Sequence, residues 1–308
     1  EWIEGWAKLP PMSGHAHHGL AIRRDGHIVT GHATEPRILI LTPDGDLVGQ
    51  FDVPLVETHG ICLAEEGGDE VLWIADVSEW QGADGKLIQV SMSGEVLREL
   101  TKADFPGYAD DAWFSPTSVV WDAPTGDLWV ADGYGQSRVH RFDRDLRHLL
   151  TVDGSEGDAG RFKCAHWVHI DRRRAEPEVY IADRENDRVQ VYGLDGRFHR
   201  CFGEGQLVTP SVFATFGDQL VIGELKARLV LLDADDRIVG FLGDGRDYVS
   251  QDGWPNRKTA DGQVISPGDL VPGRFNSPHG MAADADGNIY VSEWLLGHRF
   301  IKLRRVEA

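Results

Sequence analysis

Cysteine, positive charge and long apolar runs are all scarce in this sequence of 308 residues. The three cysteines, Cys62, Cys164 and Cys201, show no paired spacing, so a disulfide framework is not expected. This usage favours a reducing, cytoplasmic compartment. Because the chain begins at Glu1 rather than at a methionine, a secreted protein that has lost its signal peptide is the second interpretation.

Basic residues number 31 against 50 acidic ones, which gives a net charge of −19. Phosphate contacts need a basic stripe, so we expect no nucleic-acid partner. The sequence also has no run of apolar residues long enough to span a bilayer, which predicts no membrane insertion. We expect a small-molecule or peptide-like substrate, and a monomer or a small homo-oligomer.

What the sequence does contain is a repeated pattern of short apolar segments. Helical periodicity is hard to find, and Asp-Gly and Gly-Asp pairs break the apolar runs throughout, which is typical of an all-β protein. The recurrent unit is an apolar strand, a tight turn, and a strand that ends in Ala-Asp or a related pair. Six copies occur, at residues 17–32, 58–76, 116–132, 165–183, 210–224 and 278–293.

A third and a fourth strand follow most copies, and four short antiparallel strands repeated six times predict a six-bladed β-propeller. The sixth copy lacks a fourth strand, which residues 1–9 can supply so that no edge stays unpaired. We therefore predict one all-β domain over residues 1–308, with an open sandwich as the rival fold. Insertions at 101–115 and 246–274 are expected to be loops, and the second to cover the functional face as a rim or lid.

In such a blade, the start of the first strand and the end of the second strand lie on one face, with the first strand beside the central channel. The first-strand positions are His18, His59, Thr117, His166, Ser211 and His279. The second strands end at His32, Asp76, Asp132, Asp183, Glu224 and Glu293. We expect this outer group of carboxylates to be mostly structural, accepting hydrogen bonds from backbone or arginine.

Three of the first-strand positions, His59, His166 and His279, belong to alternate repeats, so their imidazoles are expected to converge on the axis. Three histidines with an open fourth position form the pattern of a catalytic metal site. Three imidazoles suit zinc, iron, manganese and other first-row ions, so the histidine pattern leaves the choice of metal open. For any one of these histidines, an ordinary capping or hydrogen-bonding role is the alternative.

The first repeat carries further histidines near its start. His18 occupies the same position as the three predicted ligands, and it is either a fourth ligand or a neighbour that handles protons; we favour the second role. His15, His17 and His32 are expected to lie at the surface or outside the ligand shell.

Several motifs together resemble a known family. They are "THGI" at 58–61, "VADGYGQSR" at 130–138, "AHWV" at 165–168, "ADRENDRVQVY" at 182–192 and "SPHGMAADADGNIYVSE" at 277–293. Over residues 17–303 the chain resembles NHL-repeat propellers, TolB-like in architecture, and in particular the peptidyl-α-hydroxyglycine α-amidating lyases. The resemblance implies a zinc ion held by His59, His166 and His279, a catalytic Tyr134 in "DGY", and an active-site Arg184 in "ADREN".

The chain also departs from this family. The family's methionine before the third histidine is Ser277 here, and the aspartate after it, which helps to bind a structural Ca²⁺, is Gly280; a structural calcium ion is therefore left open. Cysteines that form disulfides in animal members are replaced by Gly135, Ile181 and Val191. The metal core is thus retained while the substrate pocket has changed.

The leading functional hypothesis is a metal-dependent lyase for a carbinolamide or α-hydroxyglycine type of substrate. Tyr134 would take the hydroxyl proton, with Gly133 and Gly135 expected to allow unusual backbone angles around it. Arg184 would orient an anionic group or stabilise the tyrosinate, and His18 is the second candidate base. The alternatives are a metal-dependent hydrolase or hydratase using the same residues, and a non-catalytic NHL propeller that binds a protein or a ligand.

Overall fold

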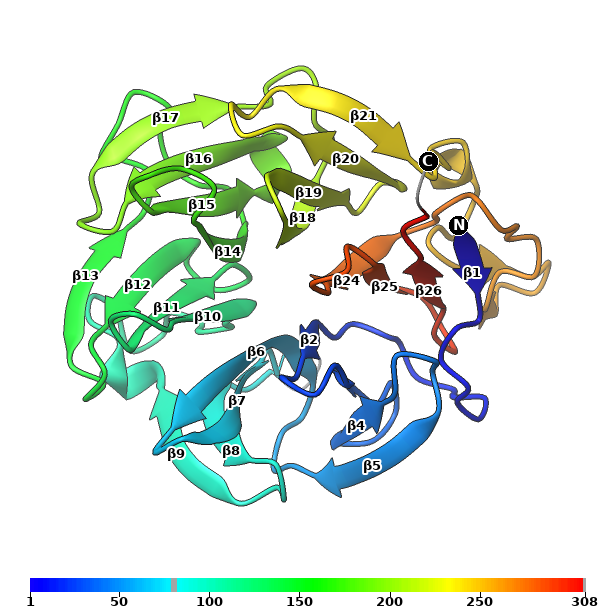
Figure 1. The fold of residues 1–308 in the computed structure, drawn as a ribbon, viewed down its shortest axis with the longest axis horizontal. Helices are drawn as coiled ribbons and strands as arrows, with labels where there is room; N and C mark the ends of the chain where they lie inside the picture. Colours follow the sequence, from blue (N-terminus) through cyan, green and yellow to red (C-terminus); the bar gives the residue numbers. More distant parts are fainter. Residues whose placement is uncertain (79–81, 307–308) are drawn as a thin grey trace. The chain divides into compact units, whose positions relative to one another are not determined.

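The repeat folds into six sheets of four antiparallel strands each, so the predicted six-bladed β-propeller fold is confirmed (Figure 1). The computed structural model describes residues 1–78 and 82–306. The chain divides into two compact halves: Phe51–Pro210, and Glu1–Gln50 together with Ser211–Ala308. Each half holds three of the four-stranded sheets, and the boundaries fall within β5 and after the first residue of β18. The interpretation of residues 1–308 as one domain stays a prediction.

The Phe51–Pro210 half contains the sheets β6–β9, β10–β13 and β14–β17, each with its strands in sequence order. Their bounds are β6 (Thr58–Glu66), β7 (Asp69–Asp76), β8 (Lys86–Ser91), β9 (Val96–Thr101), β10 (Ser118–Asp122), β11 (Asp127–Asp132), β12 (Arg138–Phe142), β13 (His148–Val152), β14 (Ala165–Asp171), β15 (Glu178–Asp183), β16 (Arg188–Gly193) and β17 (Phe198–Phe202). Two 3₁₀ turns, η2 (Lys102–Asp104) and η3 (Arg184–Asn186), follow β9 and β15.

The other half contains two further sheets in sequence order and the sheet that joins the two ends of the chain. Their bounds are β2 (Leu20–Ile22), β3 (Ile28–Gly31), β4 (Arg37–Leu41), β5 (Leu47–Asp52), β18 (Pro210–Phe216), β19 (Gln219–Glu224), β20 (Arg228–Leu232), β21 (Ile238–Leu242), β24 (Pro278–Ala283), β25 (Ile289–Glu293), β26 (Phe300–Leu303) and β1 (Trp2–Glu4). The insertion before β24 adds η4 (Tyr248–Ser250), β22 (Arg257–Lys258) and β23 (Val264–Ile265).

The last sheet is completed by the N-terminal segment, as the incomplete sixth repeat predicts. Its strand order is β1-β26-β25-β24, and Trp2 faces Leu303 in the antiparallel pairing of β1 with β26. Arg299 also bridges Glu4 of β1 and Glu293 of β25 through distances of 2.7 Å to each carboxylate. Backbone pairing and a shared arginine therefore tie the N-terminal strand to the last blade.

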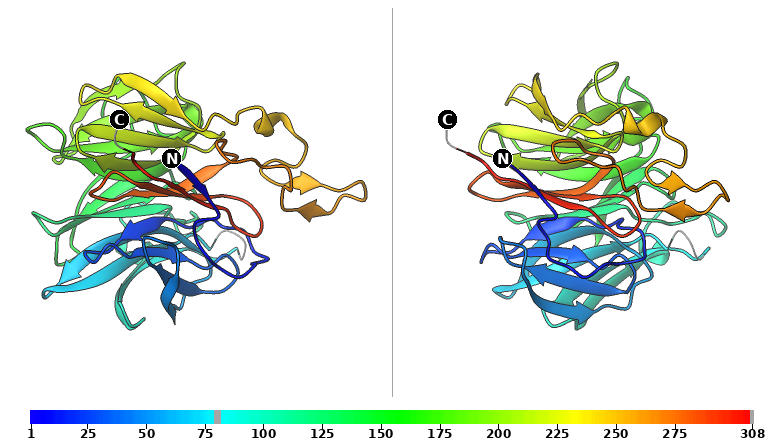
Figure 2. Two further views of the ribbon diagram at one scale, coloured as in Figure 1. Left: turned by 45° about the vertical axis from the view of Figure 1, so that its right-hand side comes forward. Right: turned by 90° about the vertical axis from the view of Figure 1, so that its right-hand side faces the viewer.

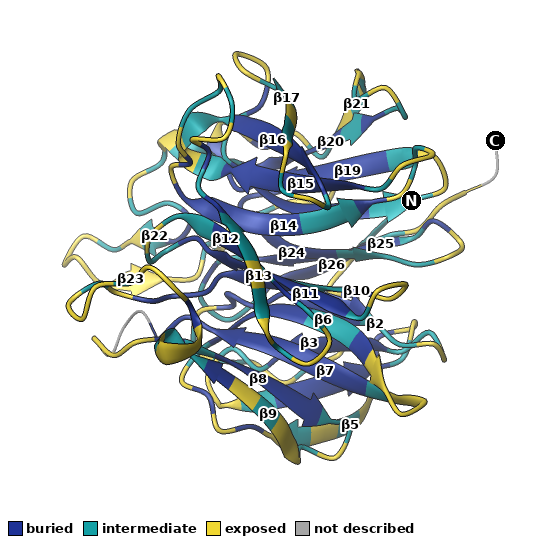
Figure 3. Ribbon diagram, turned by 90° about the vertical axis from the view of Figure 1, so that its left-hand side faces the viewer, coloured by how far each residue is buried: buried dark blue, intermediate teal, exposed yellow. Residues whose placement is uncertain are grey.

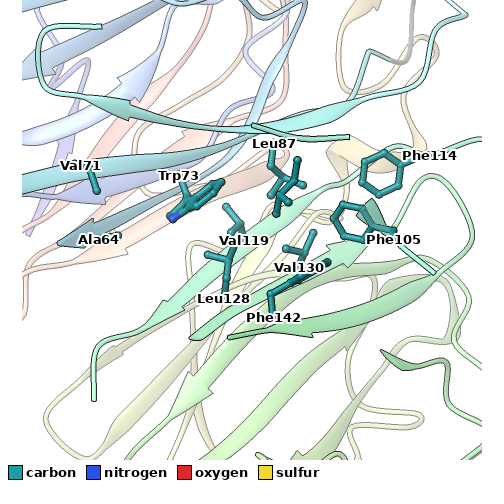
Figure 4. Close-up of a cluster of buried hydrophobic side chains, with 11 residues drawn as sticks. Ala64, Val71, Trp73, Leu87, Phe105, Phe114, Val119, Leu128, Val130 and Phe142 are labelled. Atoms are coloured by element: carbon teal, nitrogen blue, oxygen red, sulfur yellow. The ribbon is translucent and has the colours of Figure 1, made fainter. Parts of the chain in front are cut away.

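Burial follows the order of the strands within each blade (Figure 3). All six residues of β11 are buried, whereas β21, the last strand of its blade, alternates between intermediate and exposed positions. A strand covered on both faces reads as a continuous apolar run, and an outer strand shows period-two alternation. Figure 4 shows one resulting core cluster, formed by Ala64, Val71, Trp73, Leu87, Leu100, Phe105, Phe114, Val119, Leu128, Val130 and Phe142.

The two insertions differ in structure. Phe105 and Phe114 of the 101–115 insertion are buried in the cluster of Figure 4, so this segment is packed against its blade. The 246–274 insertion contains the hairpin β22–β23, in which Arg257 faces Ile265; it extends away from the strands of its own half (Figure 2). The sequence pattern did not predict this hairpin. Among the described residues, no helix is both long and apolar enough to cross a membrane.

Candidate active site

Each histidine predicted as a metal ligand lies at a β-bulge between the first two strands of its blade. The register shifts fall between Thr58 and Ile61 around His59, between Ala165 and Trp167 around His166, and between Pro278 and Gly280 around His279. β10, which begins directly after Thr117, pairs with β11 without a shift. Because a bulge inserts a residue and redirects its side chain, these three strands aim their histidines differently from a regular ladder.

Carboxylates at the ends of the second strands hold the segments that lead into the first strands. The bonds run from Val56 N and Glu57 N to Asp76, from Ser115 N to Asp132, from Lys163 N to Asp183, and from Asn276 N and Ser277 N to Glu293. A buried carboxylate that accepts backbone N–H groups anchors the chain that donates them. These carboxylates therefore have the structural role that we expected: Asp76, Asp183 and Glu293 hold the segments before the three histidine strands, and Asp132 holds the segment before β10.

His59 is held in one tautomer by the backbone. Its Nδ1 lies 2.5 Å from the carbonyl oxygen of Thr117, and because a carbonyl can only accept, Nδ1 carries the proton. Its Nε2 is then the acceptor nitrogen, and it lies 3.3 Å from the hydroxyl of Tyr134. A neutral imidazole whose other nitrogen donates to a backbone carbonyl is the usual form of a metal-binding histidine.

In the Phe51–Pro210 half, the Tyr134 hydroxyl contacts three other predicted site residues: His59, His166 and Arg184. It lies 3.1 Å from Nε2 of His166, in addition to its contact with His59. Arg184 donates to the same oxygen over 3.2 Å, and its guanidinium carbon lies 5.2 Å from the centre of the tyrosine ring. The His59 and His166 rings are 5.1 Å apart. The structure thus brings together one phenol, one guanidinium and two imidazoles.

Arg184 keeps its charge in this environment. Burial acts to lower the pKa of Arg184, but the nearby Tyr134 oxygen, Cys164 and Glu185 outweigh burial, and the pKa is raised above its ordinary value. A permanent cation within hydrogen-bond distance of a phenol stabilises the deprotonated phenolate relative to the phenol. The contact therefore favours the form of Tyr134 that can accept a proton.

The glycines around Tyr134 have a role different from the one we expected. Neither Gly133 nor Gly135 has a positive φ, so unusual backbone angles are not the reason for them. A Cβ at 133 would lie 2.6 Å from the carbonyl oxygen of Ala165, and a Cβ at 135 would lie 2.2 Å from Oδ1 of Asp132. Both glycines are required because the turn passes too close to neighbouring oxygens for any side chain.

The other half carries His17, His18 and His279. His279 is 1% exposed and His17 is 4% exposed, and their ring centres are 4.5 Å apart. Of the two positions that we expected for His17, at the surface or outside the ligand shell, the surface position is therefore wrong. The reason is that residues 15–16 bond to the segment after β25, with a bridge between His15 and Leu296, a pairing that the repeat pattern does not include.

His18 is also buried, and its tautomer can be assigned. The only proton of the Thr30 hydroxyl goes to the carbonyl of Gly19 over 3.0 Å, so His18 donates its Nδ1–H to Thr30 over 2.9 Å. The Nε2 of His18 then carries a lone pair and has no hydrogen-bond partner among the described residues. Burial, followed by the charges of neighbouring histidines, lowers the pKa of His18 to about 3, so this imidazole is neutral at physiological pH.

A glycine follows two of the three bulged histidines, and both glycines are sterically required. A Cβ at 60 would lie 2.7 Å from the Cα of Ser118, and a Cβ at 280 would lie 2.3 Å from the carbonyl oxygen of His18. Position 280 therefore cannot supply the aspartate that the family resemblance associates with a structural calcium ion. The residues present at this position do not fit such an ion.

The histidines do fit a transition metal. His17, His59 and His279 are buried, and each offers an imidazole nitrogen as a ligand. Neutral imidazoles with one acceptor nitrogen, as assigned for His59 and His18, are the protonation state that zinc, iron and similar ions require. Buried imidazole groups of this kind can hold a metal ion.

Known proteins with similar sequences include an NHL-repeat protein and an amidating lyase. NHL repeat-containing protein 3 of Homo sapiens is 27% identical over 220 residues, which cover 68% of this chain and 61% of that protein. A probable peptidyl-α-hydroxyglycine α-amidating lyase of Caenorhabditis elegans is 25% identical over 315 residues, 93% of this chain and 81% of the lyase. This chain is an NHL-repeat propeller distantly related to the amidating lyases. No family model matches it.

Among solved structures, this propeller is similar to a streptogramin B lyase, with a TM-score of 0.60 and 16% identity over 99% of this chain and 97% of the lyase. At that identity the similarity shows the fold alone. The propeller also spans less than two thirds of the human NHL protein, at 61% of its length. The distant relationship indicated by the sequence motifs is nevertheless confirmed, because relatives of both kinds cover most of the chain.

Proposed function

We propose that this propeller is a metal-dependent lyase that cleaves N-acyl-α-hydroxyglycines or closely related carbinolamides. The observation that carries this proposal is the Tyr134 hydroxyl, which accepts from Arg184 and lies 3.1–3.3 Å from two imidazole nitrogens. A phenol in contact with a buried cation and two candidate ligands is placed to act as a base on a substrate hydroxyl. The relationship to amidating lyases supports the choice of substrate class.

The proposed reaction converts the substrate hydroxyl into a carbonyl. Tyr134, as the phenolate, takes the hydroxyl proton; the carbon–oxygen double bond forms while the carbon–nitrogen bond breaks. The phenol then returns the proton to the departing amide nitrogen. An N-acyl-α-hydroxyglycine thus yields a primary amide and glyoxylate, with no atom gained or lost. A single tyrosine can serve both steps because the proton that it removes is the proton that the nitrogen needs.

Arg184 has two roles in this proposal. Its guanidinium donates to the Tyr134 oxygen, which stabilises the phenolate before the reaction. Arginine also presents several donors in a plane, which suits a carboxylate such as that of an α-hydroxyglycine. We propose that Arg184 orients this carboxylate, because the reacting carbon is bonded directly to it.

We further propose that His59, His166 and His279 hold the metal ion, with zinc as the first expectation and iron or manganese as alternatives. When bound, such an ion would act as a Lewis acid toward the substrate oxygen. The support is the shared bulge, the fixed tautomer of His59, and the burial of all three imidazoles. His17, which with His59 and His279 also offers a buried imidazole nitrogen, is the alternative to His166 as the third ligand, and His18 is proposed as an unliganded neighbour.

The test measures metal content and turnover in the same preparations. We expect about one first-row metal ion per chain, formation of glyoxylate from an N-acyl-α-hydroxyglycine, and loss of both in His59→Ala. His199→Ala is the matched control, because His199 lies in the same half and contacts Glu178, with 39% of its side chain exposed. A His59→Ala protein with full metal content and full turnover would overturn the proposal.

A further inference from the structure

The packed insertion at 101–115 reaches the turn that carries Tyr134. The ring centres of Phe105 and Phe114 are 4.5 Å apart, and the Phe105 ring also packs edge-on against His140 and Phe142, with 5.0 Å between ring centres in each pair. These contacts fix the insertion on the β10–β13 blade. Because Tyr108 lies between the two phenylalanines in sequence, its ring is held against the same blade, 5.6 Å from Phe114.

Asp132 connects this insertion to Tyr134. Its buried carboxylate accepts from the Tyr108 hydroxyl over 2.6 Å, from Ser115 N over 2.7 Å and from Gln136 N over 2.6 Å. The backbone N–H of Tyr134 donates to the carbonyl of Ser115 over 3.3 Å. The turn from 132 to 137 is therefore held at both ends by one carboxylate, and Tyr108 is the side-chain partner of that carboxylate.

The hydrogen bonds behind Tyr108 have one consistent set of directions. Burial raises the pKa of Asp132, but both of its oxygens accept from backbone N–H groups. Tyr108 therefore donates its proton to Asp132, and His140, 3.2 Å away, must donate to the Tyr108 oxygen from Nε2. His140 Nδ1 then accepts from the hydroxyl of Thr151 over 2.9 Å, and His148 donates to Thr151 over 2.8 Å. Burial lowers the pKa of His140 to about 3, which keeps it neutral with the single proton that this arrangement needs.

We propose that Tyr108 is a positioning residue for Tyr134, acting through Asp132. The Tyr108 hydroxyl, itself hydrogen-bonded to His140, holds the Asp132 carboxylate in the orientation that closes the 132–137 turn. The position of the Tyr134 oxygen relative to Arg184 and the two imidazoles depends on that turn. The kinetic part of this inference rests on the proposed lyase function, whereas the structural part does not.

The test compares Tyr108→Phe with Tyr192→Phe. Tyr192 is a matched control because its buried hydroxyl also donates one hydrogen bond, 2.8 Å long, to Gln190 in the same half, away from the turn. Each variant keeps the aromatic ring and loses the hydrogen bond that its hydroxyl donates, and Tyr108→Phe also loses the bond that the hydroxyl accepts from His140. In Tyr108→Phe we expect amide hydrogen exchange in residues 132–137 to become at least about tenfold faster than in the control.

With an N-acyl-α-hydroxyglycine as substrate, we expect kcat of Tyr108→Phe to fall about tenfold with KM changed less than twofold, because a displaced base affects the chemical step more than binding. The control should keep both constants. Unchanged exchange in 132–137, or faster exchange with unchanged kcat, would overturn the proposal. If the wild-type protein does not turn over this substrate, the lyase function fails, and the exchange comparison alone decides whether Tyr108 positions the turn.

Discussion

Replacing Tyr134 by phenylalanine is the substitution that the proposed chemistry predicts most sharply. The change removes one oxygen atom and keeps the ring, so the 5.2 Å stacking with Arg184 can remain. It removes three polar contacts of 3.1–3.3 Å: those to His59, His166 and Arg184. The turn itself is held by Asp132 and by the backbone of Ser115, neither of which needs the phenol.

The expected effect on stability is small and the expected effect on turnover is large. Loss of hydrogen bonds to a hydroxyl costs on the order of 1 kcal/mol for a typical bond, and somewhat more where Arg184 is left without this acceptor. Loss of a general base lowers kcat by about two to four orders of magnitude. Metal content should be unchanged, because the imidazoles of His59 and His166 are still present.

The assay is steady-state formation of glyoxylate, measured beside thermal unfolding and elemental analysis of the same sample. Tyr192→Phe again serves as a control for the loss of a buried tyrosine hydroxyl. The reasoning would be refuted by a folded, metal-loaded Tyr134→Phe protein whose kcat stays within about threefold of wild type, since a general base contributes far more than that. A second base would then have to be sought, and His18 is the residue that the sequence indicates.

Three further predictions concern the scaffold. Gly280→Ala should lower stability by roughly 1–3 kcal/mol, because its Cβ would lie 2.3 Å from a carbonyl oxygen, whereas Gly268→Ala, which meets nothing within 4 Å, should be neutral in urea unfolding. Burial acts to raise the pKa of Asp171, but hydrogen bonds from Arg173 outweigh burial and hold this pKa below its usual value. The pair therefore stabilises the folded protein above about pH 4, and this stabilisation is lost as the pH falls. The free energy of unfolding should differ less between pH 7 and pH 3 in Asp171→Asn than in wild type. Removing residues 258–264 of the 246–274 insertion should raise KM without changing the melting temperature, because this insertion is expected to cover the functional face as a rim or lid. An unchanged KM would mean that the insertion is not a lid.

The sequence was sufficient for the blade count and for the strand that completes the last blade. Both depend on a pattern that recurs along the chain, and the pairing of β1 with β26 follows from the missing fourth strand. Position within the repeat also selected His18, His59, His166 and His279, and all four are buried in the structure. The roles of His59, His166 and His279 as metal ligands stay a prediction.

Other features depend on contacts that no repeat encodes. The bulges at the three histidines arise from register with the neighbouring strand, and alternation alone does not show them. His17 is buried because its segment bonds to residues near the opposite end of the chain. The need for Gly133 and Gly280 comes from oxygen atoms of other segments that lie within 2.6 Å of their Cβ positions. Such close approaches become visible only in three dimensions.

The most direct test of the lyase proposal is the mass of the acyl product formed in water enriched in oxygen-18. A lyase breaks the bond between the α-carbon and the nitrogen of N-benzoyl-α-hydroxyglycine and leaves the acyl carbonyl untouched. The propeller should therefore release benzamide without oxygen-18, and a chelator should stop the formation of benzamide. Benzoic acid that contains oxygen-18 would show attack of water on the acyl carbon instead. That result would contradict the lyase proposal and favour a hydrolase.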